Sequence, residues 1–278
     1  ADKRIYALRD VTATVESLPL ICGSIMSKKL AEGIDGLVLD VKFGNGAFMK
    51  SAEQAEELAL ALAEIGRGYG KKVTCLLTDM NQPLGRYSGN ALETFECVEI
   101  MSGKTFVNSQ GRDLYADVRE LSLQLSAHML LLGNAARDLH TAYEMALATL
   151  QDGRALRKFH EICEAQGGDL TKLPTPTQSY VIQAPTSGFV SKMETEKLGI
   201  VGIMIKAGRS KTTDVLDLTA GIEYHAKIGD QVQAGQPLLT LYGNSKSLLA
   251  EAAPLAQSSV TISLQKQMPP ILIKKILQ

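Results

Sequence analysis

Hydrophobic and polar positions repeat with a helical period along residues 11–31. Counted at about 100° per residue, the apolar positions form one stripe that we expect to face a core: Val15, Leu18, Cys22, Ile25 and Met26. Ser17, Ser24 and Lys28 form a second stripe beside it, with Ile21 between the two. The pattern predicts an amphipathic helix with one polar face, and a solvated surface is the simplest use of that face.

After Gly33 the helical period gives way to short, continuous apolar runs. Residues 36–41 and 72–77 are such runs, and residues 53–65 between them have the Ala, Leu and Glu content of a helix. Strand, helix and strand at this spacing predict a βαβ unit with parallel strands. Asp79 follows the second strand at its carboxyl end, where α/β proteins gather functional groups. Alone, it does not distinguish a solvated loop residue from a functional one.

The rest of the chain changes character near residue 167. Helices are expected over four segments between Asn90 and Gln166, namely 91–101, 114–132, 139–150 and 154–165. A linker rich in Gly and Pro follows, and beyond about residue 178 short β-rich runs are punctuated by glycine. We therefore expect a separate β-rich subdomain there.

Composition and charge exclude several functional classes. The 278 residues carry 29 Lys and Arg against 30 Asp and Glu, so the basic surface that nucleic-acid binding needs is missing. No apolar stretch approaches the roughly 18 residues of a membrane span. The four cysteines are far apart and the four histidines form no cluster, which argues against a disulfide framework or a zinc site. A reducing cytosol is the expected compartment. Since the chain opens Ala-Asp-Lys-Arg, without Met or a signal peptide, we expect it to be a piece of a longer protein.

Three further motifs favour structural roles over chemical ones. The Gly44–Gly46 turn lacks the third glycine of a dinucleotide-binding loop. Residues 229–238 resemble the barrel-sandwich hybrid of biotinyl and lipoyl carriers, but residues 193–196 are Met-Glu-Thr-Glu where a carrier needs a lysine to modify. His225 lies in an alternating run and is expected to be a satisfied strand histidine.

Longer segments carry a family resemblance. The blocks Tyr6–Lys29, Asp40–Lys50, Thr78–Gly85 and Gly89–Glu93, with Ala207-Gly208-Arg209, closely resemble the thymidine/pyrimidine-nucleoside phosphorylase family, and the likeness covers essentially the whole chain. The resemblance implies a small helical domain, a large mixed α/β domain and a β-rich extension. It also implies attack of phosphate on C1′ of a pyrimidine nucleoside, giving free base and pentose 1-phosphate in nucleoside salvage.

The expected fold class is therefore α/β, with a mixed, largely parallel sheet flanked by helices. Residues 1–32 are expected to be the remnant of the helical domain and to carry base-binding residues. Residues 33–170 are expected to form a portion of the α/β domain, and residues 171–278 a barrel-sandwich-hybrid-like subdomain.

The resemblance also implies a site. Arg9, Ser24 and Lys28 match the positions that hold the pyrimidine base, with Arg9 and Lys28 as the catalytic pair, and four further residues match its apolar walls: Tyr6, Ile21, Ile25 and Phe48. The residues themselves suit that role. On a helix, Ile21, Ser24, Ile25 and Lys28 stand at i, i+3, i+4 and i+7 and share one face. Two fixed cations at the base carbonyls would stabilise the negative charge of the departing base.

One part of the family pattern has no counterpart in the chain. The family's phosphate loop, and the histidine assigned to proton delivery, lie upstream of Tyr6. The chain alone is therefore expected to lack phosphorolytic activity. In some relatives an alkali cation is bound by groups matching the carbonyls of Leu84 and Tyr87 and the carboxylate of Glu96, with further ligands from the upstream region.

Partners and alternatives follow from the same comparison. We expect a pyrimidine nucleoside as substrate, inorganic phosphate as co-substrate, no other cofactor, no nucleic acid or membrane partner, and a cytoplasmic enzyme that is a homodimer at full length. Two alternatives stay open: pentosyl transfer or phosphorolysis on a nucleotide, and a non-catalytic binding or carrier module. Thymidine and uridine preference are not separated by these residues.

Overall fold

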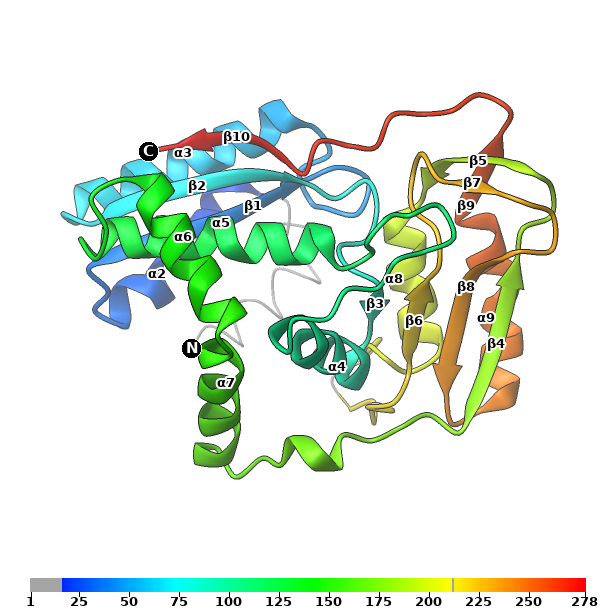
Figure 1. Cartoon of the computed structure of the whole chain (residues 1–278). Coiled ribbons are helices and arrows are strands. Elements are labelled where there is room, and N and C mark those ends of the chain that lie inside the picture. Colours follow the sequence, from blue (N-terminus) through cyan, green and yellow to red (C-terminus); the bar gives the residue numbers. More distant parts are fainter. Residues whose placement is uncertain (1–16, 212) are drawn as a thin grey trace. The chain divides into compact units, whose positions relative to one another are not determined.

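The computed structural model describes residues 17–211 and 213–278, which divide into two compact units (Figure 1). The first unit holds the described residues up to Asp79, together with Leu123–Met145 and Ile271–Gln278. The second holds Met80–Ser122 and Ala146–Pro270. The helices α5 (Ala116–Leu132) and α6 (Leu139–Gln151) each contribute residues to both units.

The first unit is built on a mixed sheet in the order β1-β2-β10. Its elements are α2 (Leu18–Ala31), β1 (Gly36–Phe43), α3 (Ala52–Gly68), β2 (Lys72–Asp79) and β10 (Ile273–Leu277). β1 and β2 are parallel and paired from Gly36 opposite Lys72 to Phe43 opposite Asp79, while β10 runs antiparallel to β2. The βαβ prediction is confirmed, and the sheet gains a strand from the far end of the sequence.

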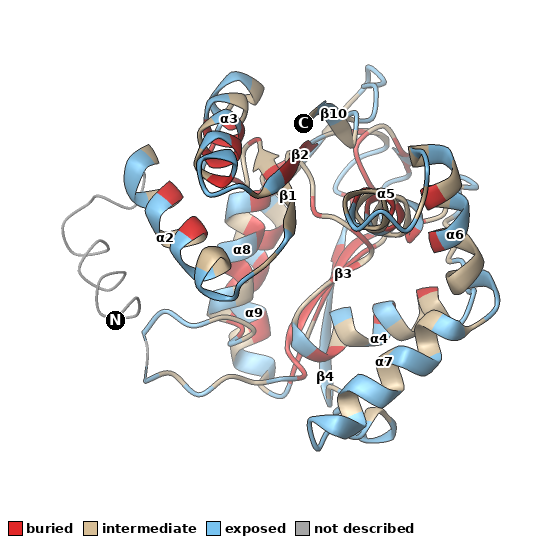
Figure 2. Ribbon diagram, turned by 90° about the vertical axis from the view of Figure 1, so that its left-hand side faces the viewer, coloured by how far each residue is buried: buried red, intermediate tan, exposed pale blue. Residues whose placement is uncertain are grey.

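Helix α3 illustrates why these residues fold as they do. Ser51 and Gln54 form a capping box that satisfies the first backbone N–H groups of the helix. Its buried residues lie along one side, as Figure 2 shows, and pack against the sheet: Ala55, Leu58, Ala59, Leu62, Ala63 and Gly66. The packing is close enough that a Cβ on Gly66 would lie 2.3 Å from Cγ2 of Val73.

The second unit contains two antiparallel sheets and several helices. One sheet has the order β3-β6-β8-β4 and the other β7-β5-β9. The strands are β3 (Tyr87–Ser88), β4 (Gln178–Gln183), β5 (Gly188–Met193), β6 (Gly221–Tyr224), β7 (Gln231–Val232), β8 (Pro237–Gly243) and β9 (Val260–Ser263). The helices are α4 (Asn90–Met101), α7 (Arg154–Ala165), α8 (Thr195–Met204) and α9 (Lys246–Ser258), with a 3-10 turn, η1, at Leu170–Lys172. The largest core cluster of the described residues lies between these sheets and α8 and α9.

The fold class predicted from the sequence, α/β with a mixed sheet flanked by helices, is confirmed. The expectation of a largely parallel sheet is wrong for the described residues, because β1 and β2 are their only parallel pair of strands and β10 joins β2 antiparallel. The four helices expected between residues 90 and 166 are present, each within two residues of its expected ends. Helices α8 and α9 were not expected, since the glycines at 199 and 202 suggested turns but lie inside α8. The domain boundaries at 32 and 170 stay predictions.

Candidate functional site

Helix α2 presents part of the predicted base site. Cys22 and Met26 are buried in the core of the first unit, and Ile21 and Ile25 pack against that core from its margin. This orientation leaves Ser24 half-buried and Lys28 exposed on the neighbouring face. The ammonium of Lys28 donates a hydrogen bond to Oγ of Ser24 at 3.4 Å, so the structure brings these two predicted residues together.

Phe48 lies in the tight turn that follows β1. The amide of Gly44 donates to the carbonyl of Met49 at 3.0 Å, and Gly44 has φ +120°, a conformation that favours glycine. Ala47 and Met49 on either side of it are buried, whereas Phe48 itself is 62% exposed. An exposed aromatic residue on a fixed turn offers an apolar surface on which a flat ligand can stack. Arg9 and Tyr6, the other predicted residues, lie outside the described residues.

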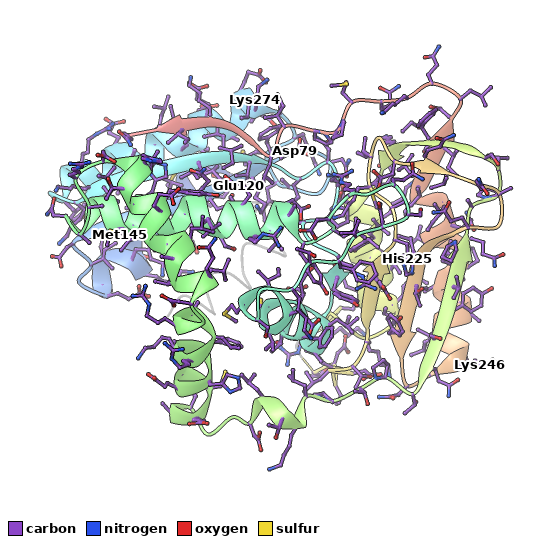
Figure 3. The ribbon with its side chains drawn as sticks, viewed as in Figure 1. Asp79, Glu120, Met145, His225, Lys246 and Lys274 are labelled. Carbon is purple, nitrogen blue, oxygen red and sulfur yellow. The ribbon has the colours of Figure 1, made fainter. Side chains whose placement is uncertain are left out.

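A polar cluster near the carboxyl ends of β1 and β2 was missed from the sequence. Lys42 donates to Asp40 Oδ2 at 2.7 Å and to Thr78 Oγ1 at 3.1 Å, and the Thr78 hydroxyl donates to Asp40 Oδ1. Asp40 and Lys42 are two residues apart on one face of β1, and Lys42 is paired in register with Thr78. The spacing of Asp40 and Lys42 along one strand was the sequence signal that could have indicated this cluster. Asp79 follows at the end of β2 (Figure 3).

In the second unit, the loop before α4 is fixed around Glu96. The amide of Arg86 donates to Glu96 Oε1 at 2.6 Å. Gly85 has φ +68°, and a Cβ there would lie 2.5 Å from Glu96 Oε2, so this position requires glycine. Glu96 is only 4% exposed. Burial raises the pKa of its carboxyl to about 7, against the opposing effects of the Arg86 amide and the Lys227 charge.

Lys227 binds the same loop from the other direction. Its ammonium, which is 1% exposed, donates to the carbonyls of Pro83 and Gly85 and lies 3.6 Å from Asp117 Oδ2. Asp117 in turn accepts from the amide of Gly85 at 3.1 Å. Burial lowers the pKa of Lys227, and the Asp117 carboxylate opposes that change.

A cavity of about 500 Å³ adjoins this loop within the second unit. Leu84, Tyr87 and Glu96, the three residues that the resemblance assigns to a cation, all line it. A buried carboxyl and backbone carbonyls are oxygen ligands of the kind that a hard cation prefers. No group of three His, Cys, Asp or Glu side chains suited to a metal ion occurs among the described residues.

His225 has a hydrogen-bond partner, as expected, but it lies one residue beyond the end of β6 and not in a strand. Its Nε2 lies 2.8 Å from Oγ1 of Thr240, and its Nδ1 lies 3.6 Å from the Glu223 carboxylate (Figure 3). Glu223 also pairs with Arg86 and accepts from the Tyr242 hydroxyl at 2.7 Å. Burial lowers the pKa of His225. These contacts join β6, β8 and the loop before β3 into one polar network.

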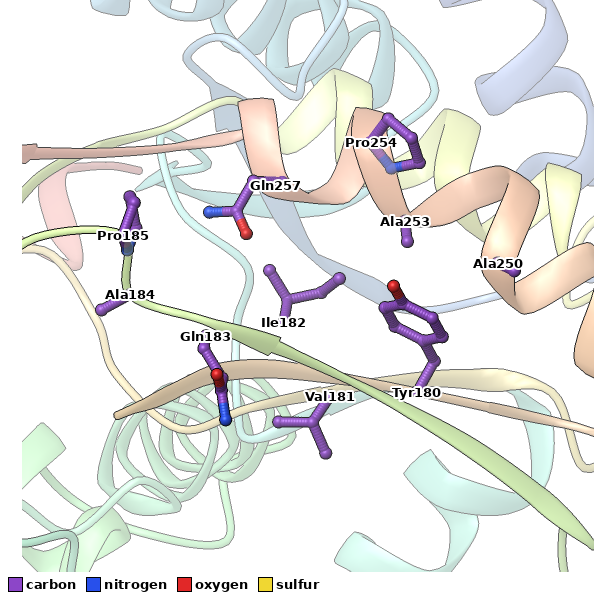
Figure 4. Close-up of a pocket in the computed structure, with 10 residues that line it drawn as sticks. All are labelled: Tyr180, Val181, Ile182, Gln183, Ala184, Pro185, Ala250, Ala253, Pro254 and Gln257. Carbon is purple, nitrogen blue, oxygen red and sulfur yellow. The ribbon is translucent and has the colours of Figure 1, made fainter. Parts of the chain in front are cut away.

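The second unit holds a further cavity, and the segment that a carrier protein would modify can be compared with the structure. A cavity of about 500 Å³ between β4 and α9 is lined by Tyr180, Ile182, Pro254 and neighbours and by no charged residue (Figure 4). The segment in which a carrier would present a lysine runs from β5 directly into α8 at Thr195, with no hairpin tip.

No helix in the described part of the chain has both the length and the apolar character to cross a membrane.

Comparison with known proteins gives two family matches. Residues 1–156 match the description "Glycosyl transferase family, a/b domain", and residues 189–263 match "Pyrimidine nucleoside phosphorylase C-terminal domain". Among curated proteins, the chain is 43% identical over 284 residues to the pyrimidine-nucleoside phosphorylase of Staphylococcus haemolyticus (strain JCSC1435). It is 42% identical over 283 residues to those of two Staphylococcus aureus strains, bovine RF122 / ET3-1 and USA300. All of this chain, but 63% of each relative's length, is aligned.

Proposed function

This chain belongs to the glycosyl transferase family whose a/b domain it matches, and we propose that it serves the phosphorolysis of pyrimidine nucleosides. In this reaction an oxygen of inorganic phosphate bonds to C1′ of thymidine, deoxyuridine or uridine while the bond from C1′ to the base breaks. The base leaves with the electron pair of that bond and is then protonated, and the pentose becomes a 1-phosphate. The printed names of the relatives and the C-terminal domain match support this proposal.

The pair formed by Ser24 and Lys28 is the observation that carries the proposal. A pyrimidine has carbonyl acceptors and an imide N–H on its edge. The Lys28 ammonium can donate to a carbonyl, and the Ser24 hydroxyl can donate or accept. As the base leaves, its carbonyls gain negative charge, so a fixed ammonium there binds the transition state more tightly than the substrate. Arg9 has the same role in the proposal.

Binding of free thymine tests this site in the chain itself. Calorimetric titration is expected to show that Lys28→Ala weakens thymine binding by about tenfold, the loss of one charge-assisted hydrogen bond. Lys29→Ala is the matched control, because Lys29 is the next residue of α2 and pairs with Glu32 at 3.1 Å. Equal binding by wild type and Lys28→Ala would contradict the assignment. Tighter binding of thymidine monophosphate than of thymidine, lost in Lys28→Ala, would favour the nucleotide alternative at this site.

We propose further that this chain alone does not complete the reaction. It spans less than two thirds of the length of the relatives it matches, and it contains no glycine-rich loop with the Lys and Ser of the family's phosphate site. Thymidine incubated with phosphate and this chain should release no thymine, measured by chromatography. Steady thymine release would refute this proposal while leaving the base site intact.

An alkali cation at Glu96 is also proposed, on the resemblance and on the loop chemistry. When bound, such a cation supplies a countercharge that fixes the loop, and Glu96 with the carbonyls of Leu84 and Tyr87 would hold it. At pH 8 and constant ionic strength, potassium chloride should raise the Tm of wild type relative to tetramethylammonium chloride. Glu96→Gln should remove that difference. Glu99→Gln, on the same helix, should keep it, and an equal response of all three proteins would contradict the site.

Two broader properties belong to the same proposal. The full-length protein is proposed to be a homodimer, which sedimentation velocity would test. A cytoplasmic location is proposed because all four cysteines are free thiols, as expected in a reducing compartment.

A further inference from the structure

A cavity of about 340 Å³ opens in the first unit near the amino ends of β1 and β2. Its volume lies within the range of small-molecule pockets, about 300–1,000 Å³. Lys72, which begins β2, lines it together with Arg67 from the last turn of α3 and His128 from α5. Phe48 follows the opposite end of β1, and an eight-residue strand spans about 25 Å. The proposed phosphorolysis uses none of the residues at this cavity.

His128 has no partner that explains its burial. It is 1% exposed, and neither Nδ1 nor Nε2 has a hydrogen-bond partner among the described residues. Burial lowers its pKa, so the ring is neutral at pH 7 and offers one N–H donor and one acceptor. Buried polar groups without partners are uncommon in native proteins, and each calls for a water, an ion or a ligand.

The cavity also concentrates positive charge. Arg67, Lys71 and Lys72 line it, and none of the three forms an ion pair with another residue in the described parts of the chain. Gln278, the last residue of the sequence, lines it too, so its terminal carboxylate is set against three cationic side chains. Val73 and Leu131 contribute apolar surface to the same cavity. A guanidinium with two ammonium groups supplies three positive charges, enough to neutralise the two negative charges of a phosphoryl group, and the apolar surface suits an organic substituent.

We propose that this cavity binds a phosphate monoester with a small, flat organic group. Arg67, Lys71 and Lys72 bind the phosphoryl oxygens, and the N–H of His128 donates to one of them. The organic group packs against Val73 and Leu131. This assigns the first unit a second ligand site that the proposed reaction does not require.

Titration with phenyl phosphate, followed by nitrogen-15 NMR of the histidine rings, tests the proposal. The ring signals of His128, identified by their loss in His128→Leu, are expected to shift and to saturate. Arg67→Ala should weaken this binding by roughly tenfold, the loss of one charge-assisted contact. Arg137→Ala is the matched control, since Arg137 lies in the same unit and is paired with Asp138 at 3.0 Å. It should bind like wild type.

Three results would overturn the proposal. The first is His128 signals that stay unmoved while phenyl phosphate is added. The second is an equal shift with phenol, which would make the cavity merely apolar. The third is equal weakening by Arg67→Ala and Arg137→Ala, which would reduce the effect to general charge. If His128→Leu fails to fold, Lys71→Ala serves as the second binding variant. The ring signal of His128 is then assigned by elimination, with His140→Gln, His160→Gln and His225→Gln identifying the other three histidines.

Discussion

At the scale of single residues, Lys227 carries a charge that has been almost wholly removed from water. Removing a buried charge from solvent costs several kcal/mol unless its partners compensate. Here two loop carbonyls and the Asp117 carboxylate do so. The Lys227 ammonium thereby fixes the backbone of residues 83–85 in the loop before β3. The same loop contacts the Glu96 carboxyl through the Arg86 amide.

Replacing this ammonium should therefore be costly. Lys227→Met keeps the length of the side chain but leaves two carbonyls and Asp117 without their donor, so the free energy of unfolding should fall by about 3 kcal/mol. Urea unfolding followed by circular dichroism measures the change. Lys246→Met, at an exposed lysine, is the control and should change stability by less than about 0.5 kcal/mol. Equal small changes in both variants would show that the Lys227 contacts are not needed.

The site residues show how far residue patterns alone lead. Helical spacing was sufficient to put Ser24 and Lys28 on one face, because the contact is local to α2. The cluster of Asp40, Lys42 and Thr78 required the register between two strands, which no spacing in the sequence fixes. The burial of Lys227 depends on groups more than 100 residues away and leaves no local signal.

At the scale of elements, α3 and β2 are packed through a glycine. Gly66→Ala would place a Cβ 2.3 Å from Cγ2 of Val73, a backbone-proximal atom of a stiff side chain. We expect a loss of about 1–2 kcal/mol in the free energy of unfolding, although alanine favours helix. Gly68→Ala, two residues later, meets no atom within 4 Å and should be neutral or slightly stabilising. The same denaturant experiment compares them, and a stabilised Gly66→Ala would contradict the packing.

Glycine also explains why helix α8 was not predicted from the sequence. In the C-terminal half, frequent glycine suggested short strands and turns, and the strands are indeed there. Gly199 and Gly202, however, lie inside α8, and a Cβ on either would meet nothing within 4 Å. Glycine therefore does not mark a turn at these positions. Helix α9 was missed for a related reason, since Pro254 stands within it.

At the scale of the whole molecule, the chain returns to its first sheet at the end. β10 pairs with β2 after nearly 200 intervening residues, and Lys275 pairs with Glu56 of α3 at 2.6 Å. No periodicity could indicate this pairing, because residues 273–277 are short and contain two lysines. Long-range strand pairing is therefore the part of the fold that the sequence pattern left open.

Removing β10 should affect the first unit selectively. A chain ending at Pro270 leaves β2 at the edge of its sheet, so the amides of Cys75–Thr78 should exchange with deuterium faster, while those of β8 should not change. Hydrogen exchange with mass spectrometry resolves the two. Lys275→Ala is the milder control, because an exposed ion pair contributes about 0–1 kcal/mol. Uniform acceleration in both sheets would contradict a selective role for this strand.

The position of β10 in the sequence also imposes an order on biosynthesis. Residues 273–277 leave the ribosome after every residue of the second unit. Until then, the backbone N–H and C=O groups on the β10 side of β2 have no strand to pair with. Nascent chains that stall or terminate early would leave this edge of β2 open to pairing with other nascent chains on the same messenger RNA. A protein built this way has a reason to depend on chaperones that shield polypeptides as they emerge.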